Sequence, residues 1–176
     1  MESVNRLHLY MGEGKGKTTA AMGLALRMLG HERRVLVAQF LKSGTSGELR
    51  ALRTVKGVII VEMPAFHKFT SQMNEAERAR AQTALTIAIR ALIAQIEAQR
   101  PDLIVLDELA LAAQLTMLSE ESAHALIDAA LAQGEVALTG RYAPQSIIDR
   151  ADYVSEITKR THPFDEGVPA RKGVEF

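Results

Sequence analysis

Ten residues, MGEGKGKTTA at positions 11–20, combine three glycines with two lysines and two threonines. Glycines this close together suit neither a helix nor a packed strand, but they let successive backbone N–H groups turn toward one anion. An apolar run precedes the stretch and a helical pattern follows it, which is the context of a phosphate-binding loop. In such a loop Lys17 reaches the terminal phosphates and the Thr18 hydroxyl binds Mg²⁺. The residues therefore predict a phosphate site.

The stretch departs from the pattern G-x-x-x-x-G-K-[ST] at one position, because Met11 stands where the first glycine is expected. A flexible basic turn is the alternative interpretation, and the flanking strand and helix patterns argue against it. For Lys15 two interpretations stay open, since its side chain points either at phosphate or at solvent.

Two acids, Asp107 and Glu108, end the apolar run LIVLDE. A phosphate loop predicts an acid at the tip of a later strand, where it completes a magnesium site with oxygen ligands. The spacing does not decide which acid touches the metal and which acts through water. Two solvated acids at an exposed strand end are the alternative.

Arg141 ends the next strand-like run, LTGR, at the same predicted edge of the sheet. An arginine there contacts a phosphate or a transition state, or it forms a surface ion pair. Arg27, on the helix beyond the loop, carries no signal of its own. The five histidines show no metal-ligand spacing.

These residues need elements that bring strand ends together, and apolar runs alternate with helical patterns along the whole chain. Such alternation implies right-handed crossovers and a mostly parallel sheet. We expect one α/β domain over residues 1–176, with about six strands covered by helices on both faces. The expected strands are residues 6–11, 34–41, 57–63, 102–108, 135–140 and 152–158, and the expected helices are 18–30, 74–100 and 119–134, with a short one from Pro144.

The overall composition excludes several classes. Lys plus Arg and Asp plus Glu both number 21, and this zero balance argues against general binding of nucleic acid. The chain has no cysteine, no secretory pattern at its start and no apolar run of the ~18 residues that span a membrane. We therefore predict a cytoplasmic protein that binds neither nucleic acid nor membrane.

Five stretches together resemble one family: GEGKGKTTAAMGLALRMLGH, VLVAQFLK, DLIVLDEL, VALTGRYAPQSIIDRADYVSEI and HPFDEGVPARKGVEF. They are similar to the P-loop corrinoid adenosyltransferases, which adenosylate cob(I)alamin or cob(I)yrinic acid a,c-diamide. The loop and the acids are common to many nucleotide hydrolases, whereas the last two stretches are more specific. The resemblance implies a P-loop NTPase-type fold and transfer of the 5′-deoxyadenosyl group of ATP to the Co(I) of a reduced corrinoid, with release of triphosphate.

The resemblance also implies site residues. Thr18 and Glu108 hold Mg²⁺, with Asp107 as the other candidate ligand, and Arg27 and Arg141 line the nucleotide site. The implied catalytic residues are Lys17, Glu108 and Arg141. The implied triphosphate-binding residues are Gly12, Glu13, Gly14, Lys15, Gly16, Lys17, Thr18 and Thr19, although Glu13 stands where the family usually has asparagine.

The segment MPAFHKFTSQMN, residues 63–74, matches the part of the family that touches the corrinoid. Family members carry a phenylalanine and a tryptophan there, which displace the lower ligand of cobalt, but this chain has no tryptophan. Phe66 aligns with the phenylalanine, and His67, Lys68 or Phe69 takes the second position. We predict that Phe66 and Phe69 act together, and the alternative is that both anchor the segment to the core.

The resemblance implies ATP and a reduced corrinoid as substrates, a flavoprotein as candidate reductant, and a homodimer. The alternative functions are a P-loop ATPase or kinase without corrinoid chemistry, and a non-catalytic carrier of nucleotide or corrinoid. The sequence does not select the corrinoid. In the C-terminal segment, Phe164 and Phe176 predict that this tail packs onto the domain.

Overall fold

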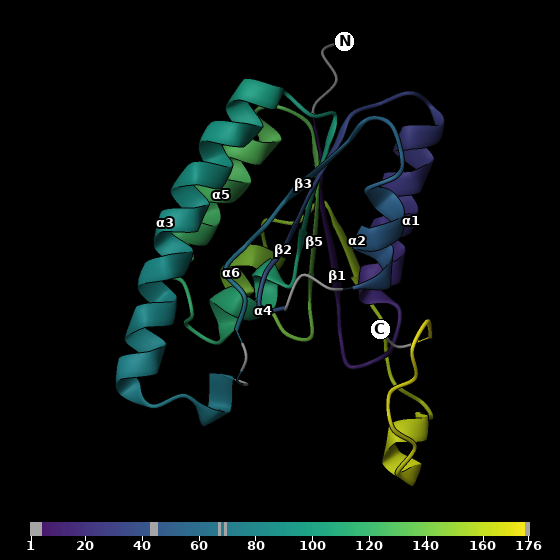
Figure 1. Ribbon diagram of the computed structural model, residues 1–176, viewed down its shortest axis with the longest axis vertical. Coiled ribbons are helices and arrows are strands. Elements are labelled where there is room, and N and C mark those ends of the chain that lie inside the picture. Colours follow the sequence, from purple (N-terminus) through teal and green to yellow (C-terminus); the bar gives the residue numbers. More distant parts are fainter. Residues whose placement is uncertain (1–4, 43–45, 67, 69, 175–176) are drawn as a thin grey trace.

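The computed structural model describes residues 5–42, 46–66, 68 and 70–174. Its centre is a six-stranded sheet in the order β3-β2-β4-β5-β1-β6, and every paired strand is parallel to its neighbours (Figure 1). The expected fold class is confirmed. The strands are β1 (Leu7–Met11), β2 (Val35–Gln39), β3 (Val58–Val61), β4 (Leu103–Asp107), β5 (Glu135–Gly140) and β6 (Tyr153–Glu156).

Helices cover both faces of the sheet, as expected. Figure 1 shows α1 and α2 on one side, with α3 and α5 on the other. The α-helices are α1 (Lys17–Gly30), α2 (Gly47–Leu52), α3 (Glu75–Gln99), α4 (Leu109–Gln114), α5 (Glu120–Leu131) and α6 (Gln145–Ile148), and two 3₁₀ turns are η1 (Thr70–Gln72) and η2 (Pro163–Glu166). The sequence patterns did not predict α2 and α4.

The middle strands β2 and β4 are apolar up to their last residue, because each face of the sheet meets a helix layer. Along β4, Ile104 and Leu106 belong to the core cluster on the side of α3 and α5. Leu103 and Val105 belong to the cluster on the side of α1. All of these residues are fully buried, so β4 is held at the centre and its last residue, Asp107, is carried to a fixed point at the carboxyl edge.

Local signals fix the start of the long helix. Asn74 and Glu77 form the expected capping box of α3, in which the Asn74 side chain accepts from the Glu77 N–H and the Glu77 carboxylate accepts from the Asn74 N–H. Among the described residues, no helix combines the length and the apolarity that a membrane span requires.

The C-terminal tail, residues 158–174, extends beyond the sheet (Figure 1). Phe164 is 73% exposed, so the expectation that it packs onto the domain is wrong. The part around Phe164 turns on itself, since His162 accepts from the Phe164 N–H and Lys159 pairs with Asp165. Farther along the tail, Val174 lies beside the loop that follows β1. Phe176 lies outside the described residues.

Candidate functional site

The site lies where parallel strands present their carboxyl ends, because β1, β4 and β5 are neighbours at the centre of the sheet. The loop after β1 is fastened to this edge through its backbone. Gly12 N–H donates to Arg141 O at 3.1 Å, and Gly14 N–H donates to Ile157 O at 2.7 Å. A Cβ on Gly14 would lie 2.7 Å from that oxygen, so the approach excludes any side chain there.

Gly16 caps α1 at φ 118°, a conformation that glycine adopts without strain. Lys17, the first residue of α1, folds back over the loop, and its Nζ donates to Gly14 O at 2.7 Å. Burial lowers the pKa of the Lys17 ammonium. The loop therefore joins a helix N-terminus to a partly buried cation, and both favour an anion.

Asp107 is fully buried, and both of its carboxylate oxygens are saturated with hydrogen bonds. Its Oδ1 accepts from the hydroxyls of Thr18 at 2.9 Å and Thr139 at 2.6 Å. Its Oδ2 accepts from Gln39 Nε2 at 3.0 Å and from Lys42 Nζ at 2.6 Å. A carboxylate has about four acceptor positions, so Asp107 has none left for a ligand.

Glu108 differs from its neighbour in each respect. Its backbone adopts φ 63°, which is strained for a residue with a side chain. Its Oε2 is buried and has no hydrogen-bond partner among the described residues. Burial raises the pKa of the Glu108 carboxyl. A buried polar atom without a partner in strained backbone marks a position where a ligand is expected.

The donor chemistry at this point fits Mg²⁺. The Thr18 hydroxyl and the Glu108 carboxylate supply hard oxygen atoms, which Mg²⁺ prefers. The residues that the structure describes contain no cluster of three His, Cys, Asp or Glu side chains. An ion at this site would therefore take most of its ligands from phosphates and water, as Mg²⁺ commonly does.

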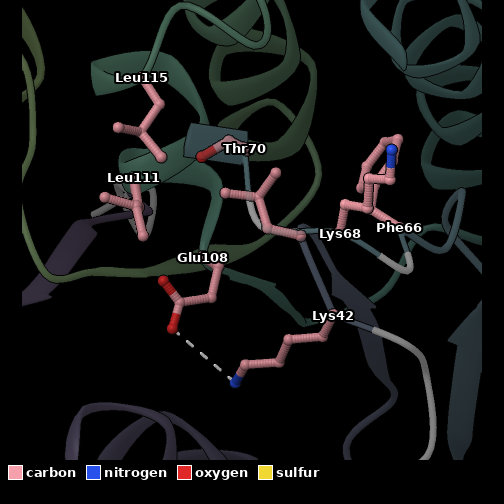
Figure 2. Close-up of a pocket in the computed structure, with 8 residues that line it drawn as sticks. Lys42, Phe66, Lys68, Thr70, Glu108, Leu111 and Leu115 are labelled. Carbon is pink, nitrogen blue, oxygen red and sulfur yellow. Dashed lines mark ion pairs between the residues drawn. The ribbon is translucent and has the colours of Figure 1, made fainter. Parts of the chain in front are cut away.

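Two cavities meet at this edge. The phosphate pocket, with the loop residues 15–19 on its wall, also includes Lys42, Ser46 and Glu108. The apolar pocket, of about 400 Å³, is lined by Leu41, Lys42, Phe66, Lys68, Thr70, Glu108, Leu111 and Leu115. Lys42 and Glu108 belong to both pockets, and Figure 2 shows their side chains turned toward each other, with Lys42 Nζ 3.9 Å from Glu108 Oε1.

Other predicted residues take different positions. Glu13 is exposed and accepts from the Tyr142 hydroxyl at 2.7 Å, which lowers the pKa of its carboxyl. Its charge is thus held by Tyr142, outside the phosphate pocket. Arg141 is exposed at the end of β5, and its charge acts on Glu13 and Lys17. Arg27 is exposed in the last turn of α1, about 15 Å along the axis from Lys17.

The predicted corrinoid segment is described in part. Phe66 lines the apolar pocket and also packs against the core cluster, so it is available to a ligand while remaining anchored. Phe69 and His67 lie outside the described residues. Lys68 pairs with Glu77 at 2.6 Å.

Sequence reasoning missed Lys42, Leu111 and Leu115 as site residues. Lys42 follows β2, and β2 pairs with β4, so the rule that strand ends meet at one edge was a signal for it. The two leucines lie on or beside α4, whose six residues left no recognisable pattern.

The geometry described so far fits many nucleotide-binding proteins, and comparison with known proteins decides among them. Residues 4–176 match the family model of the ATP:corrinoid adenosyltransferases BtuR/CobO/CobP. The chain belongs to this family. A corrinoid adenosyltransferase of Pseudomonas aeruginosa is 37% identical over 175 residues, which covers 97% of this chain and 83% of the relative.

Two other relatives agree. Corrinoid adenosyltransferase CobA of Salmonella typhimurium is 34% identical over 168 residues, covering 96% of this chain and 84% of CobA. A corrinoid adenosyltransferase of Escherichia coli K12 is 33% identical with the same coverage. The family resemblance is thereby confirmed, and the ATPase, kinase and carrier alternatives are not favoured.

Proposed function

We propose that this protein transfers the 5′-deoxyadenosyl group of ATP to the Co(I) centre of a reduced corrinoid. The electron pair of Co(I) attacks the ribose 5′ carbon, the bond from this carbon to the triphosphate oxygen breaks, and its electrons leave with inorganic triphosphate. Cobalt is thereby oxidised to Co(III) as the cobalt–carbon bond forms. The observation that carries this proposal is the meeting of the phosphate pocket and the apolar pocket at Lys42 and Glu108.

The phosphate pocket supports the departure of triphosphate. Negative charge grows on the whole triphosphate as the bond breaks, so donors fixed around phosphate stabilise the transition state more than the substrate. The loop amides, the N-terminus of α1 and the Lys17 ammonium are such donors. Lys17 leaves Gly14 O to contact phosphate. Arg141 adds positive charge near the same loop.

We assign the direct magnesium contacts of this chain to Thr18 and Glu108. The support is the free Oε2 of Glu108 beside an Asp107 whose oxygens are saturated. Asp107 then orients the Thr18 hydroxyl and touches no metal. When bound, Mg²⁺ neutralises charge on the triphosphate.

The apolar pocket receives part of the corrin. Phe66, Leu111 and Leu115 line it with hydrocarbon, which excludes water from the reacting face. Phe66 contributes to displacement of the lower ligand, and we retain Phe69 as its partner in this role. Arg27 remains a proposed nucleotide contact that rests on the family resemblance.

The reaction is tested by incubating the protein with ATP, Mg²⁺ and chemically reduced cobalamin. We expect adenosylcobalamin and intact triphosphate in equal amounts, with little ATP turnover when corrinoid is omitted. Brisk release of ADP and phosphate without corrinoid would replace the proposal by an ATPase.

Homodimerisation, a flavoprotein reductant, a cytoplasmic location and a single domain over residues 1–176 are further proposals. Tyr153 and Val154 support the dimer, because they are exposed on β6, the strand at the sheet edge. One cooperative unfolding transition and a dimer mass in solution are the expected results. A monomer mass in solution would contradict the proposed homodimer.

A further inference from the structure

Lys42 lies at the centre of the proposed magnesium site. Lys42 Nζ donates to Asp107 Oδ2 at 2.6 Å and to Thr18 Oγ1 at 3.0 Å, and it lies 3.9 Å from Glu108 Oε1. Its side chain is 31% exposed, so Lys42 is partly accessible to solvent. One cation thus contacts or approaches both proposed magnesium ligands, Thr18 and Glu108, and also Asp107, which orients Thr18.

The contact with Thr18 has a specific consequence. The Thr18 hydroxyl donates its proton to Asp107, so only its lone pairs are available for a metal. Lys42 donates to that same oxygen. An ion bound by Thr18 and Glu108 would stand beside the ammonium at a distance where like charges repel strongly. Lys42 and Mg²⁺ therefore compete for the same place.

We propose that Lys42 is a positioning residue that occupies the metal site before the nucleotide arrives. It holds Thr18 and Asp107 in register and neutralises the acids, and it gives up the Thr18 oxygen when magnesium enters together with the triphosphate. The metal alone then binds poorly, because it brings no phosphate charge that could draw the ammonium away. This inference rests on the proposed function, since it assumes that Mg²⁺ binds at Thr18 and Glu108.

After magnesium binds, the Lys42 ammonium remains close to the triphosphate. Lys42 lies on the wall between the phosphate pocket and the apolar pocket, so a short movement from Thr18 leaves its charge at the junction of the two cavities. The 5′ carbon of the nucleotide must cross this junction to meet cobalt. A positive charge there favours departure of the triphosphate.

The test measures the melting temperature of the nucleotide-free protein against the concentration of MgCl₂ at constant ionic strength. Because a ligand that binds the folded state raises its stability, the midpoint of the rise reports metal affinity. In Lys42→Met this midpoint should fall to about one tenth of the wild-type concentration or lower. Lys42→Arg keeps a cation and should remain near wild type.

Lys15→Met is the matched control, since Lys15 also lines the phosphate pocket but has no ion pair with either acid among those of the described residues. General loss of one nearby charge should move its midpoint by less than about threefold. Equal midpoints in Lys42→Met and Lys15→Met, or no change in both, would overturn the inference. Adenosylation by the wild type is measured separately. If the wild type is active but the MgCl₂ midpoint of Lys42→Met equals that of wild type, the role of Lys42 is refuted and the proposed function stands.

Discussion

The phosphate pocket and the apolar pocket share Lys42 and Glu108, but they are built in different ways. Residues 15–19 of the loop and the side chains of Lys42, Ser46 and Glu108 line the phosphate pocket, and Gly14 bonds this loop to the backbone of Ile157. Side chains from the segment after β2, from the segment before α3, and from α4 and the residues beside it form the apolar pocket. In the proposed function the phosphate pocket receives the triphosphate, and the apolar pocket receives part of the corrin.

The largest expected effect separates the two neighbouring acids, Asp107 and Glu108. Asp107→Ala removes the buried acceptor of four side-chain donors and should lower the free energy of unfolding by about 3–5 kcal/mol. Glu108→Gln should preserve stability while abolishing adenosylation or raising the Mg²⁺ requirement. Denaturant unfolding and product formation measure the two effects. A fully active Glu108→Gln beside a folded but inactive Asp107→Ala would shift the metal assignment by one position.

Lys17→Ala tests the charge of the phosphate pocket. Loss of a charge-assisted contact worth roughly 1.5–3 kcal/mol should weaken ATP binding or the rate between tenfold and somewhat over a hundredfold. Titration calorimetry with ATP measures the binding part. Lys56→Ala, at an exposed turn between α2 and β3, is the matched control and should bind ATP normally. Equal affinity in both variants would show that backbone amides suffice.

Phe66→Ala tests the apolar pocket. Its ring is partly available in the pocket, so its loss should raise the KM for cobalamin about tenfold, while ATP affinity and melting temperature change little. The exposed Phe164 of the tail supplies the matched control, Phe164→Ala, which should leave the KM unchanged. A fall of several degrees in melting temperature with near-normal activity would make Phe66 an anchor of the core.

The smallest effect concerns the strand that supports the loop. Asp152 accepts from the Leu7 N–H and from Arg6, and the Leu7 hydrogen bond is the main cause that lowers the pKa of its carboxyl. Since the folded-state pKa is the lower one, this stabilisation is present above the unfolded-state pKa and is lost as pH falls through the folded-state pKa. The melting temperature of Asp152→Asn should therefore lie slightly below wild type at neutral pH and converge with it in acid. A constant difference at all pH values would assign the effect to another cause.

The contrast between the two pockets also explains what the sequence could predict. The phosphate loop is recognisable as a local motif, and Gly16 is required there by its own φ of 118°. The close approach of Ile157 that requires Gly14 is, by contrast, a contact between distant parts of the sequence. Asp107 and Glu108 were identifiable because a strand end places them. Lys42 and Leu111 become site residues only through contacts with residues that are distant in the sequence, and no local sequence pattern indicates those contacts. The exposure of Phe164 was missed for the same reason, since the sequence does not show whether the fold offers an apolar surface on which this ring can pack.

The attachment of the loop also bears on the order in which the chain can fold. Among the described residues, β1 pairs with β5 and β6 alone, although it precedes both of them by more than 120 residues in the sequence. The backbone oxygen that fastens Gly14 belongs to Ile157, near the other end of the chain. A nascent chain that has been made as far as β4 thus already contains the whole loop and both acids, but it has no partner strand to hold the loop. We therefore expect nucleotide binding to become available only after the chain has been made as far as Ile157.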